Sequence, residues 1–286
     1  MRSGCKPNSI RRGALIAAAI WLPGLAAPAS AQTFEQQVAQ CDNENDRFAP
    51  AVAISACTAL LRSERFGDRL WAVFNQRGRA WMAQREYARA IADFSEAIRL
   101  NPQYADALYL RGLAYVYQGD HARAIADYNE AIRLSPEWAL AYHGRAQAYG
   151  AMGDRVRATI LYREAAQRFP DNADIQNGLC WNLTLSGGDL TEARAWCDAA
   201  LRSQPNRAEF LDSRGLVGLK QRRFQDAWND YDAAVRANPA RAGLLYGRGL
   251  AALRLGRRAA GQADLARATT LDRGIAQTYA GYGLTP

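Results

Sequence analysis

The sequence has 286 residues and a formal net charge of +8. Half of that excess lies in the first twelve residues, at Arg2, Lys6, Arg11 and Arg12, so the rest of the chain is only weakly basic. No block of basic residues follows, which argues against a nucleic-acid-binding arm.

Residues 1–31 have the features of a secretion signal. The basic start is followed by an apolar run from Ala14 to Leu22 and by Ala29-Ser30-Ala31, a small-x-small cleavage site. The apolar run is too short to span a bilayer as a helix, which needs about 20 residues, and no later stretch qualifies. We therefore expect cleavage near Ala31 and a periplasmic or secreted chain without a transmembrane anchor.

A 34-residue period organises the chain from Trp71 onward. Six segments align, with one extra residue in the fourth, and we name them repeats 1 to 6: 71–104, 105–138, 139–172, 173–207, 208–241 and 242–275. Position 8 of the repeats holds Gly78, Gly112, Ala146, Cys180, Gly215 and Gly249. Position 24 holds Phe94, Tyr128, Tyr162, Cys197, Tyr231 and Leu265. Positions 20 and 27 are almost all alanine, and position 32 is proline in repeats 1 to 5.

This pattern predicts a pair of antiparallel helices in each repeat. Small residues at positions 8, 20 and 27 let the two helices approach closely, and the bulky residue at position 24 fills the space between them. Turns such as Gly119-Asp120, Gly153-Asp154 and Gly188-Asp189 suit the end of one helix and the capping of the next. Proline at position 32 ends the second helix. No run of alternating β-branched residues occurs, so the predicted fold class is all-α.

Repeats 1 to 6 resemble the tetratricopeptide repeat (TPR) family. Repeat 2, "ADALYLRGLAYVYQGDHARAIADYNEAIRLSPEW", matches the family pattern at Gly112, Tyr115, Gly119, Ala124, Tyr128, Ala131 and Pro136. The resemblance implies a right-handed α-solenoid of helix pairs, in a secreted bacterial repeat protein. It also implies capped ends, since each helix pair must be covered by its neighbour.

The two ends of the array extend it. Residues 32–70 are expected to form a divergent N-terminal helix pair whose first position is Phe34. Residues 276–286 are expected to cap the last repeat, with a short helix running from Ile275 to Tyr282.

The four cysteines of the mature chain occupy matched positions. Cys41 and Cys57 fall at positions 8 and 24 of the N-terminal pair, as do Cys180 and Cys197 in repeat 4. In an antiparallel hairpin these positions face each other, which suits disulfides in an oxidising compartment. A metal clip would need further ligands, and a redox pair is usually spaced two residues apart. We predict two structural disulfides and neither a metal site nor a cofactor.

Arginine and aspartate recur together. Position 7 holds Arg77, Arg111, Arg145, Leu179, Arg214 and Arg248. Position 23 holds Asp93, Asp127, Leu161, Trp196, Asp230 and Asp264. Their correlated loss in repeat 4 favours ion pairs that hold the helix layers, with Arg145 expected to use Asp127. The alternative is a comb of arginines for an anionic ligand.

Catalytic groups are scarce in the sequence. His121 begins a second helix and is expected at the surface, and His143 has no cysteine, serine motif or carboxylate pair at a recognisable spacing. Gly187-Gly188 lacks the lysine and strand of a phosphate loop. We predict that the protein is not an enzyme.

The resemblance places positions 2, 5, 9, 12 and 13 on a concave, ligand-facing groove. The predicted groove residues are Asn75, Arg79, Tyr109, Val116, Tyr117, His143, Gln147, Asn177, Trp181, Asp212 and Tyr246. Aromatic rings with polar edges among amides and charges suit a peptide or a protein segment. The distant Arg79 and Arg254 do not form the family's clamp for a peptide carboxylate.

The predicted function is therefore a non-catalytic periplasmic interaction module or scaffold that binds an unidentified protein or peptide in this groove. A self-associating architectural protein of the envelope is the alternative, and an apolar patch on an end repeat would favour it. An unrecognised enzyme around His143 is a third. Nucleic acid is not an expected partner.

Overall fold

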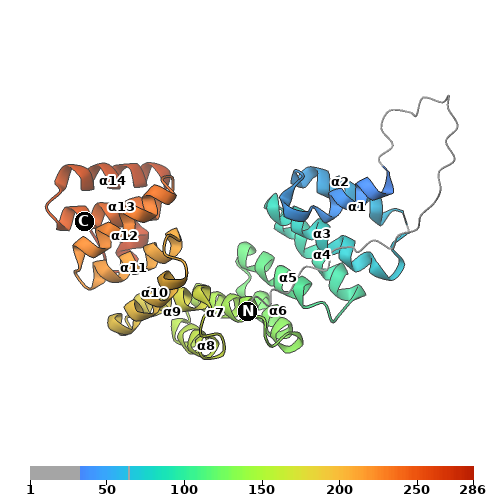
Figure 1. Ribbon diagram of the computed structural model, residues 1–286, viewed down its shortest axis with the longest axis horizontal. Helices are drawn as coiled ribbons and strands as arrows, with labels where there is room; N and C mark the ends of the chain where they lie inside the picture. The colour runs from blue at the N-terminus through green and yellow to red at the C-terminus, as the bar shows by residue number, and fades with distance from the viewer. Residues whose placement is uncertain (1–32, 64) are drawn as a thin grey trace, which may run out of the picture. The chain divides into compact units, whose positions relative to one another are not determined.

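The computed structural model describes residues 33–63 and 65–286, and the predicted export signal at residues 1–31 lies outside them. The described residues form fifteen α-helices, two short 3-10 helices (η1, Glu44–Asp46, and η2, Gly67–Arg69) and no strand, which confirms the predicted all-α class (Figure 1). None of these helices is long and apolar enough to cross a membrane.

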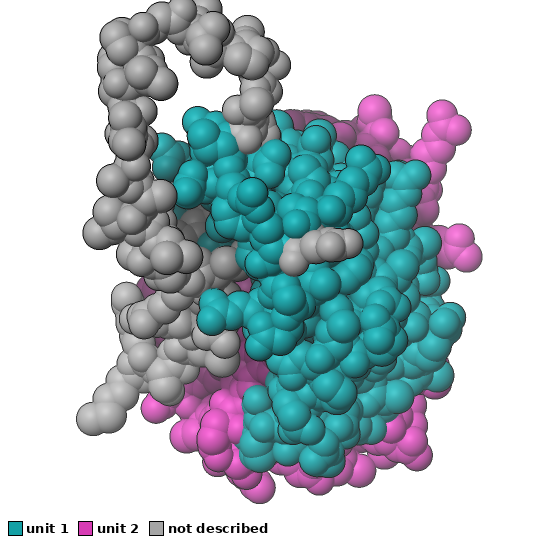
Figure 2. Space-filling model, turned by 90° about the vertical axis from the view of Figure 1, so that its right-hand side faces the viewer, with its two compact units in different colours: residues 1–136 teal, residues 137–286 magenta. Residues whose placement is uncertain are grey.

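Contacts divide the chain into two compact units, which meet in sequence between Pro136 and Glu137 (Figure 2). The helices of the first unit are α1 (Phe34–Asp42), α2 (Pro50–Leu61), α3 (Leu70–Ala83), α4 (Tyr87–Leu100), α5 (Ala105–Gln118) and α6 (His121–Leu134). Those of the second unit are α7 (Ala139–Ala151), α8 (Arg155–Arg168), α9 (Ala173–Ser186), α10 (Leu190–Ser203), α11 (Ala208–Lys220), α12 (Phe224–Ala237), α13 (Ala242–Arg254), α14 (Arg258–Leu271) and α15 (Ile275–Gly281).

Consecutive helices pair as the 34-residue period predicts. The most extensive contacts join α3 to α4, α5 to α6, α9 to α10, α11 to α12 and α13 to α14. Helices α5, α7, α9, α11 and α13 begin at the first residue of repeats 2 to 6. In the second compact unit the first helix of a repeat also contacts the first helix of the next, so α7, α9, α11 and α13 lie in a row. We name the surface of these four helices the first-helix surface.

The helix-to-helix turns place position 15 in the left-handed region. Gly119, Gly153, Gly187 and Gly256 have φ between 74° and 87° there, whereas repeats 1 and 5 hold Arg85 and Arg222 at φ 61° and 59°. In repeat 4 the left-handed residue is Gly187 and not Gly188, and Asp189 then caps α10 by accepting from the Thr191 amide at 2.7 Å.

Positions 8 and 24 touch, as predicted. A Cβ on Gly112 would lie 2.9 Å from the ring of Tyr128, so only glycine allows this approach without a shift. Where cysteines replace the pair, disulfides close the same contact, joining Cys41 to Cys57 and Cys180 to Cys197 with Cα separations of 4.8 and 5.4 Å. Both predicted disulfides are confirmed, and all four cysteines are buried in the core.

The predicted C-terminal helix is α15, which contacts α13 and α14. Its buried residues, Ile275 and Tyr279, belong to a core cluster that reaches from α9 to the C-terminus. The last helix pair, α13 and α14, is therefore covered by α15.

Candidate functional site

Four of the five arginines at position 7 pair with a carboxylate of their own repeat, and the four pairs have the same geometry. In each, Nε and Nη2 of the arginine donate to the two carboxylate oxygens of the aspartate sixteen residues later, at 2.6 to 2.9 Å. The pairs are Arg77 with Asp93, Arg111 with Asp127, Arg214 with Asp230 and Arg248 with Asp264. A planar guanidinium and a carboxylate form strong bidentate bonds of this kind.

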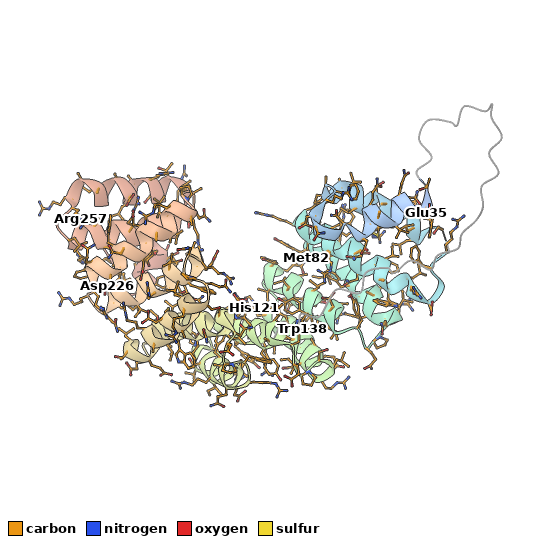
Figure 3. The ribbon with its side chains drawn as sticks, viewed as in Figure 1. Glu35, Met82, His121, Trp138, Asp226 and Arg257 are labelled. Carbon is orange, nitrogen blue, oxygen red and sulfur yellow. A yellow bond between two sulfur atoms is a disulfide. The ribbon has the colours of Figure 1, made fainter. Side chains whose placement is uncertain are left out.

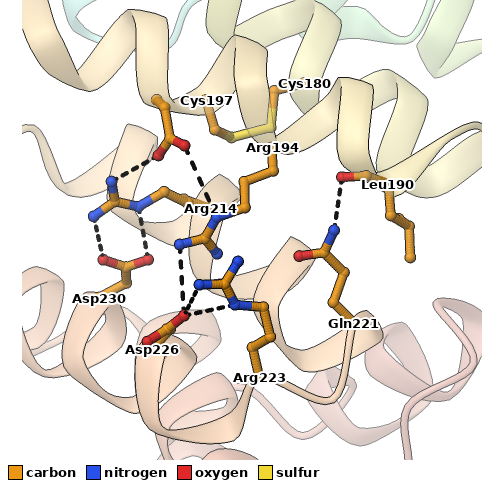
Figure 4. Close-up of polar contacts among 10 residues, drawn as sticks. Cys180, Leu190, Arg194, Cys197, Arg214, Gln221, Arg223, Asp226 and Asp230 are labelled. Atoms are coloured by element: carbon orange, nitrogen blue, oxygen red, sulfur yellow. Dashed lines mark hydrogen bonds and ion pairs between the residues drawn. A yellow bond between two sulfur atoms is a disulfide. The ribbon is translucent and has the colours of Figure 1, made fainter.

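Each of these arginines also reaches back to the preceding helix pair through Nη1. The acceptors all stand at position 25 and are Thr58, Ser95, Asp198 and Asp232, at 3.2, 3.1, 2.9 and 2.9 Å. Figure 4 shows Arg214 between Asp230 and a carboxylate of the preceding pair, with Arg194, Arg223 and Asp226 beside it. These four arginines thus join consecutive helix pairs and are not presented to an anionic ligand.

The role of position 25 was not predicted from the sequence, although the periodicity holds a signal for it. An oxygen acceptor stands there before each of these four arginines. Position 25 of repeat 3 is instead Arg163, and the next position 7 is Leu179. Arg163 turns to Glu192 of α10, with Nη2 and Oε2 2.7 Å apart. Arg145, the remaining arginine of position 7, lies over the ring of Tyr142 at 5.5 Å.

The predicted groove residues of the first compact unit lie in different surroundings. Asn75, Arg79 and Tyr109 contact other side chains of the helix array. Asn75 is 3% exposed, and its Nδ2 donates to Asp106 Oδ2 at 3.2 Å, while Arg79 Nη2 lies 2.6 Å from the same oxygen. The ring of Tyr109 packs 5.7 Å from that of Tyr128.

Tyr117 is 58% exposed and stacks on Tyr87, with ring centroids 5.0 Å apart, and Val116 is half-buried. Arg79 also lines a cavity of about 960 Å³ together with Asp42, Met82 and Leu110. Tyr109, Val116 and Tyr117 do not line that cavity. In this compact unit the predicted residues therefore do not converge on one cavity.

In the second compact unit five predicted groove residues converge on one cavity of about 470 Å³. They come from three consecutive first helices: His143 and Gln147 from α7, Asn177 and Trp181 from α9, and Asp212 from α11. Figure 3 shows the side chains that the helices of this unit carry. A cavity of this volume lies within the range of ligand sites in proteins. We name it the α7–α11 cavity.

Two buried polar atoms of the cavity have no hydrogen-bond partner within the described part of the chain. They are Nδ1 of His143 and Oδ1 of Asn177. Buried polar atoms are nearly always paired in folded proteins, so these two are the atoms of the cavity wall to which a ligand or a water molecule would bond. Burial lowers the pKa of His143, and its ring packs against that of Tyr162 at 5.6 Å. The imidazole is therefore neutral at pH 7.

A chain of alternating charges lines one side of the cavity. Arg207 Nη1 lies 2.8 Å from Asp174 Oδ1 and its Nε 3.5 Å from Glu209 Oε2. Arg241 Nη1 lies 3.8 Å from Glu209 Oε1 and its Nη2 3.3 Å from Asp212 Oδ2. Burial raises the pKa of Asp212 to about 6, and Arg241 opposes that rise. Because each charge of this chain has an opposite neighbour, this side of the cavity suits a neutral polar ligand, while Arg155 adds a further positive charge to the lining.

The charged residues of this cavity wall were not predicted from the sequence either. Asp174 and Glu209 stand at position 2, one of the positions expected to face the groove, but they were not singled out. Arg207 and Arg241 each precede the first position of a repeat, and that shared register was the available signal.

Tyr246, the last predicted groove residue, does not line this cavity. It is 3% exposed, and its ring packs 4.8 Å from that of Tyr279 on α15. The C-terminal helix therefore covers it.

The described residues hold no cluster of three or more His, Cys, Asp or Glu side chains that could bind a metal ion. His143 shares its cavity with Asp174 and Asp212, but both carboxylates face arginines.

Comparisons with known proteins agree with this architecture. A family model described as Tetratricopeptide repeat matches residues 75–137, 143–208 and 214–276. The chain therefore belongs to the tetratricopeptide repeat family. Proteins of this family are generally non-catalytic scaffolds that bind protein partners, and the fold indicates a protein-interaction scaffold here. No curated protein sequence matches the chain.

Solved structures of low sequence identity share the fold. A tetratricopeptide repeat protein from Parabacteroides merdae is 16% identical, with a TM-score of 0.69 over 87% of this chain and 98% of that one. PilW, a type IV pilus biogenesis factor, is 16% identical with a TM-score of 0.62 over 71% and 93% of the two chains. The Pseudomonas aeruginosa protein pilF is also 16% identical, with a TM-score of 0.61 over 73% and 96%.

Proposed function

We propose that the mature protein is a non-catalytic periplasmic scaffold that binds a peptide or an extended protein segment on the first-helix surface of the second compact unit. The observation that carries the proposal is the α7–α11 cavity, where five predicted groove residues meet and Asn177 Oδ1 and His143 Nδ1 are unpaired.

The chemistry of the cavity supports a peptide ligand. The Asn177 amide carries both an acceptor and donors, so it can bond the N–H and C=O groups of an extended backbone. Trp181 offers a large apolar surface with a polar edge. The alternating charges on one side of the cavity are already paired with one another, which favours an uncharged stretch of peptide along that side.

The export signal supports the periplasm, because it would deliver the chain to a compartment where disulfides form. Cell fractionation followed by N-terminal sequencing tests this part. The expected product is a periplasmic chain that begins after Ala31 and carries no free thiols. An uncleaved chain in the cytoplasm would contradict it.

Binding is tested by capture from an envelope extract with paired variants. Asn177→Leu removes the cavity amide at similar volume, and Asn229→Leu makes the same change on the exposed face of α12. Gln147→Arg places a charge in the cavity, and Gln225→Arg places one on α12. We expect a protein that wild type and both α12 variants capture and that both cavity variants lose, at unchanged circular dichroism.

Equal capture by all five proteins would move the binding site away from the cavity. Capture of the protein's own copies alone would favour the architectural alternative.

A further inference from the structure

The C-terminal segment, residues 275–286, does more than cover the last helix pair. Its first contacts are those of a cap: Tyr279 Oη donates to the Gly243 carbonyl at 2.8 Å and lies 3.4 Å from Tyr231 Oη. These partners belong to α12 and α13, next to the end of the array.

Tyr282 reaches much further back along the array. Its ring meets that of Trp181 edge-on, with centroids 5.9 Å apart. Trp181 stands on α9, two helix pairs before the last one, and lines the α7–α11 cavity. Burial raises the pKa of Tyr282, and the nearby Asp212 carboxylate, another residue of the cavity wall, adds to the rise. Covering α13 and α14 does not require contacts with α9, which belongs to an earlier helix pair.

The segment contacts residues at repeat positions that are expected to face a ligand. Trp181 is position 9 of repeat 4, and Tyr246 and Asp212 are position 5 of repeats 6 and 5. The three residues lie on the row of first helices, where a peptide is expected to bind, and Tyr279 and Tyr282 approach all of them. The end of the chain therefore lies where a ligand would.

The segment is held by a small number of groups. Apart from its buried side chains, Arg254 Nη2 of α13 donates to the Thr285 carbonyl at 2.9 Å. Helix α15 has seven residues, too few for a stable helix on its own. Only Ile275 and Tyr279 are buried in it, and Tyr282 and Leu284 are half-buried beyond it. The exposed residues 272–274 connect it to α14. Its position next to the surface supplies an effective concentration on the order of millimolar, which can hold a weak ligand in place.

We propose that the C-terminal segment is an intramolecular ligand of the first-helix surface, displaced by a partner that presents a helix of the same pattern. This inference rests on the proposed function and names the partner's chemistry. The pattern is an apolar residue followed by aromatic residues four and seven positions later, as in Ile275, Tyr279 and Tyr282. Side chains at this spacing share one face of a helix, the arrangement by which amphipathic helices bind grooves.

The test separates the segment from the chain after folding. A specific protease site is inserted between Asp272 and Gly274 in the full mature chain, and the folded protein is cut or left uncut. A fluorescent synthetic peptide of residues 274–286 is then titrated, and its anisotropy is measured. We expect saturable binding to the cut protein at least ten-fold tighter than to the uncut protein, whose own segment occupies the surface.

Changes in the peptide leave the protein untouched and so cannot fail by unfolding it. Tyr282→Ala in the peptide should weaken binding at least ten-fold, whereas Gln277→Ala, at an exposed position, should not change it. Trp181→Ala in the cut protein should weaken binding of the unaltered peptide to a similar extent. Trp228→Ala on α12 is the matched control.

Equal binding to cut and uncut protein, or no binding to either, would overturn the proposal. So would a loss of helical circular dichroism when the cut segment is washed away, because the segment would then be a fixed part of the fold. Capture from the envelope extract by wild type and its loss with Asn177→Leu would still support the proposed function, so the two failures are distinguishable.

Discussion

Gly215 lies so close to Tyr231 that a Cβ at residue 215 would be 2.8 Å from the tyrosine ring. Tyr231 is fully buried and also packs against Gly247 of the next repeat, so its ring has no free space on either side. We expect Gly215→Ala to lower the free energy of unfolding by about 1–3 kcal/mol through overpacking.

Urea unfolding followed by circular dichroism measures this change. Gly243→Ala is the control, because a Cβ at residue 243 would have no described atom within 4 Å apart from its chain neighbours and the backbone of its own helix. Alanine also favours the helix by about 0.5–1 kcal/mol. Equal effects of the two substitutions would contradict the role of the close approach.

The buried arginine–aspartate pairs should be costly to break from one side. Arg111 and Asp127 are 21% and 8% exposed, and the other acceptor of Arg111 is the neutral Ser95 hydroxyl, so Asp127→Ala leaves a poorly solvated guanidinium and should cost about 3 kcal/mol. Replacing both residues, as in Arg111→Met with Asp127→Leu, should cost less than Asp127→Ala alone.

A double-mutant cycle measures the coupling between them. The exposed pair of Glu130 and Arg133 is the reference, and its coupling should be much smaller because solvent screens it. A coupling of similar size in both cycles would show that the buried geometry adds nothing.

The disulfide between Cys180 and Cys197 closes a loop in the unfolded chain with a sequence separation of 17. Its removal by Cys180→Ala with Cys197→Ala should cost about 3 kcal/mol, according to the chain-entropy model. Unfolding of wild type in the presence of a reductant should show a similar or greater loss, since both disulfides then open. Insensitivity of the unfolding midpoint to reductant would contradict the prediction.

The left-handed arginines are sites where stability can be gained. Arg222 has φ 59° at the position where four other repeats hold glycine, and its side chain is exposed. Because left-handed backbone costs an ordinary residue about 1–2 kcal/mol, Arg222→Gly should raise the free energy of unfolding by about 1 kcal/mol. Thermal unfolding measures the gain, and Arg223→Gly, at the next residue, should give none.

Asp212 should make stability depend on pH between about 4 and 6. Its pKa is near 6 in the fold and 3.8 as the ordinary value, so the folded chain binds this proton more tightly than the unfolded chain. The free energy of unfolding therefore falls as the pH rises through this window, by roughly 3 kcal/mol, and levels off above it. In Asp212→Asn this contribution is absent.

Urea unfolding at several pH values compares the two proteins. The free energy of unfolding of Asp212→Asn should rise relative to that of wild type from pH 4 to 6, and the difference should stay constant above pH 6. Parallel curves would show that the carboxyl does not titrate in this window.

Much of the fold could be predicted because one pattern recurs six times. The contact of Gly112 with Tyr128 and its replacement by the bond between Cys180 and Cys197 follow from facing positions of a hairpin. The predicted position of the left-handed residue in repeat 4 was wrong by one residue. Gly187 and Gly188 both suit such a turn, and the sequence does not distinguish between them.

The candidate site was harder to predict, because it depends on which side chains consecutive repeats bring together. The resemblance to the family placed His143, Asn177 and Asp212 on one surface, and they line one cavity. It could not show that Tyr246, at an equivalent position, is covered. That outcome depends on α15, which lies outside the repeat and obeys no period.

The backward reach of the arginines affects how the array unfolds. Each such arginine bonds within its own repeat and to the repeat before it, so one repeat cannot open without exposing unpaired groups of its neighbour. In a linear array the strength of such nearest-neighbour terms sets the cooperativity of unfolding. The second compact unit lacks this bond only between α8 and α9, where Arg163 and Leu179 replace the acceptor and the arginine. Native-state hydrogen exchange should therefore find α9 to α14 opening as one block, and the α8–α9 junction as the place where partial unfolding begins or stops.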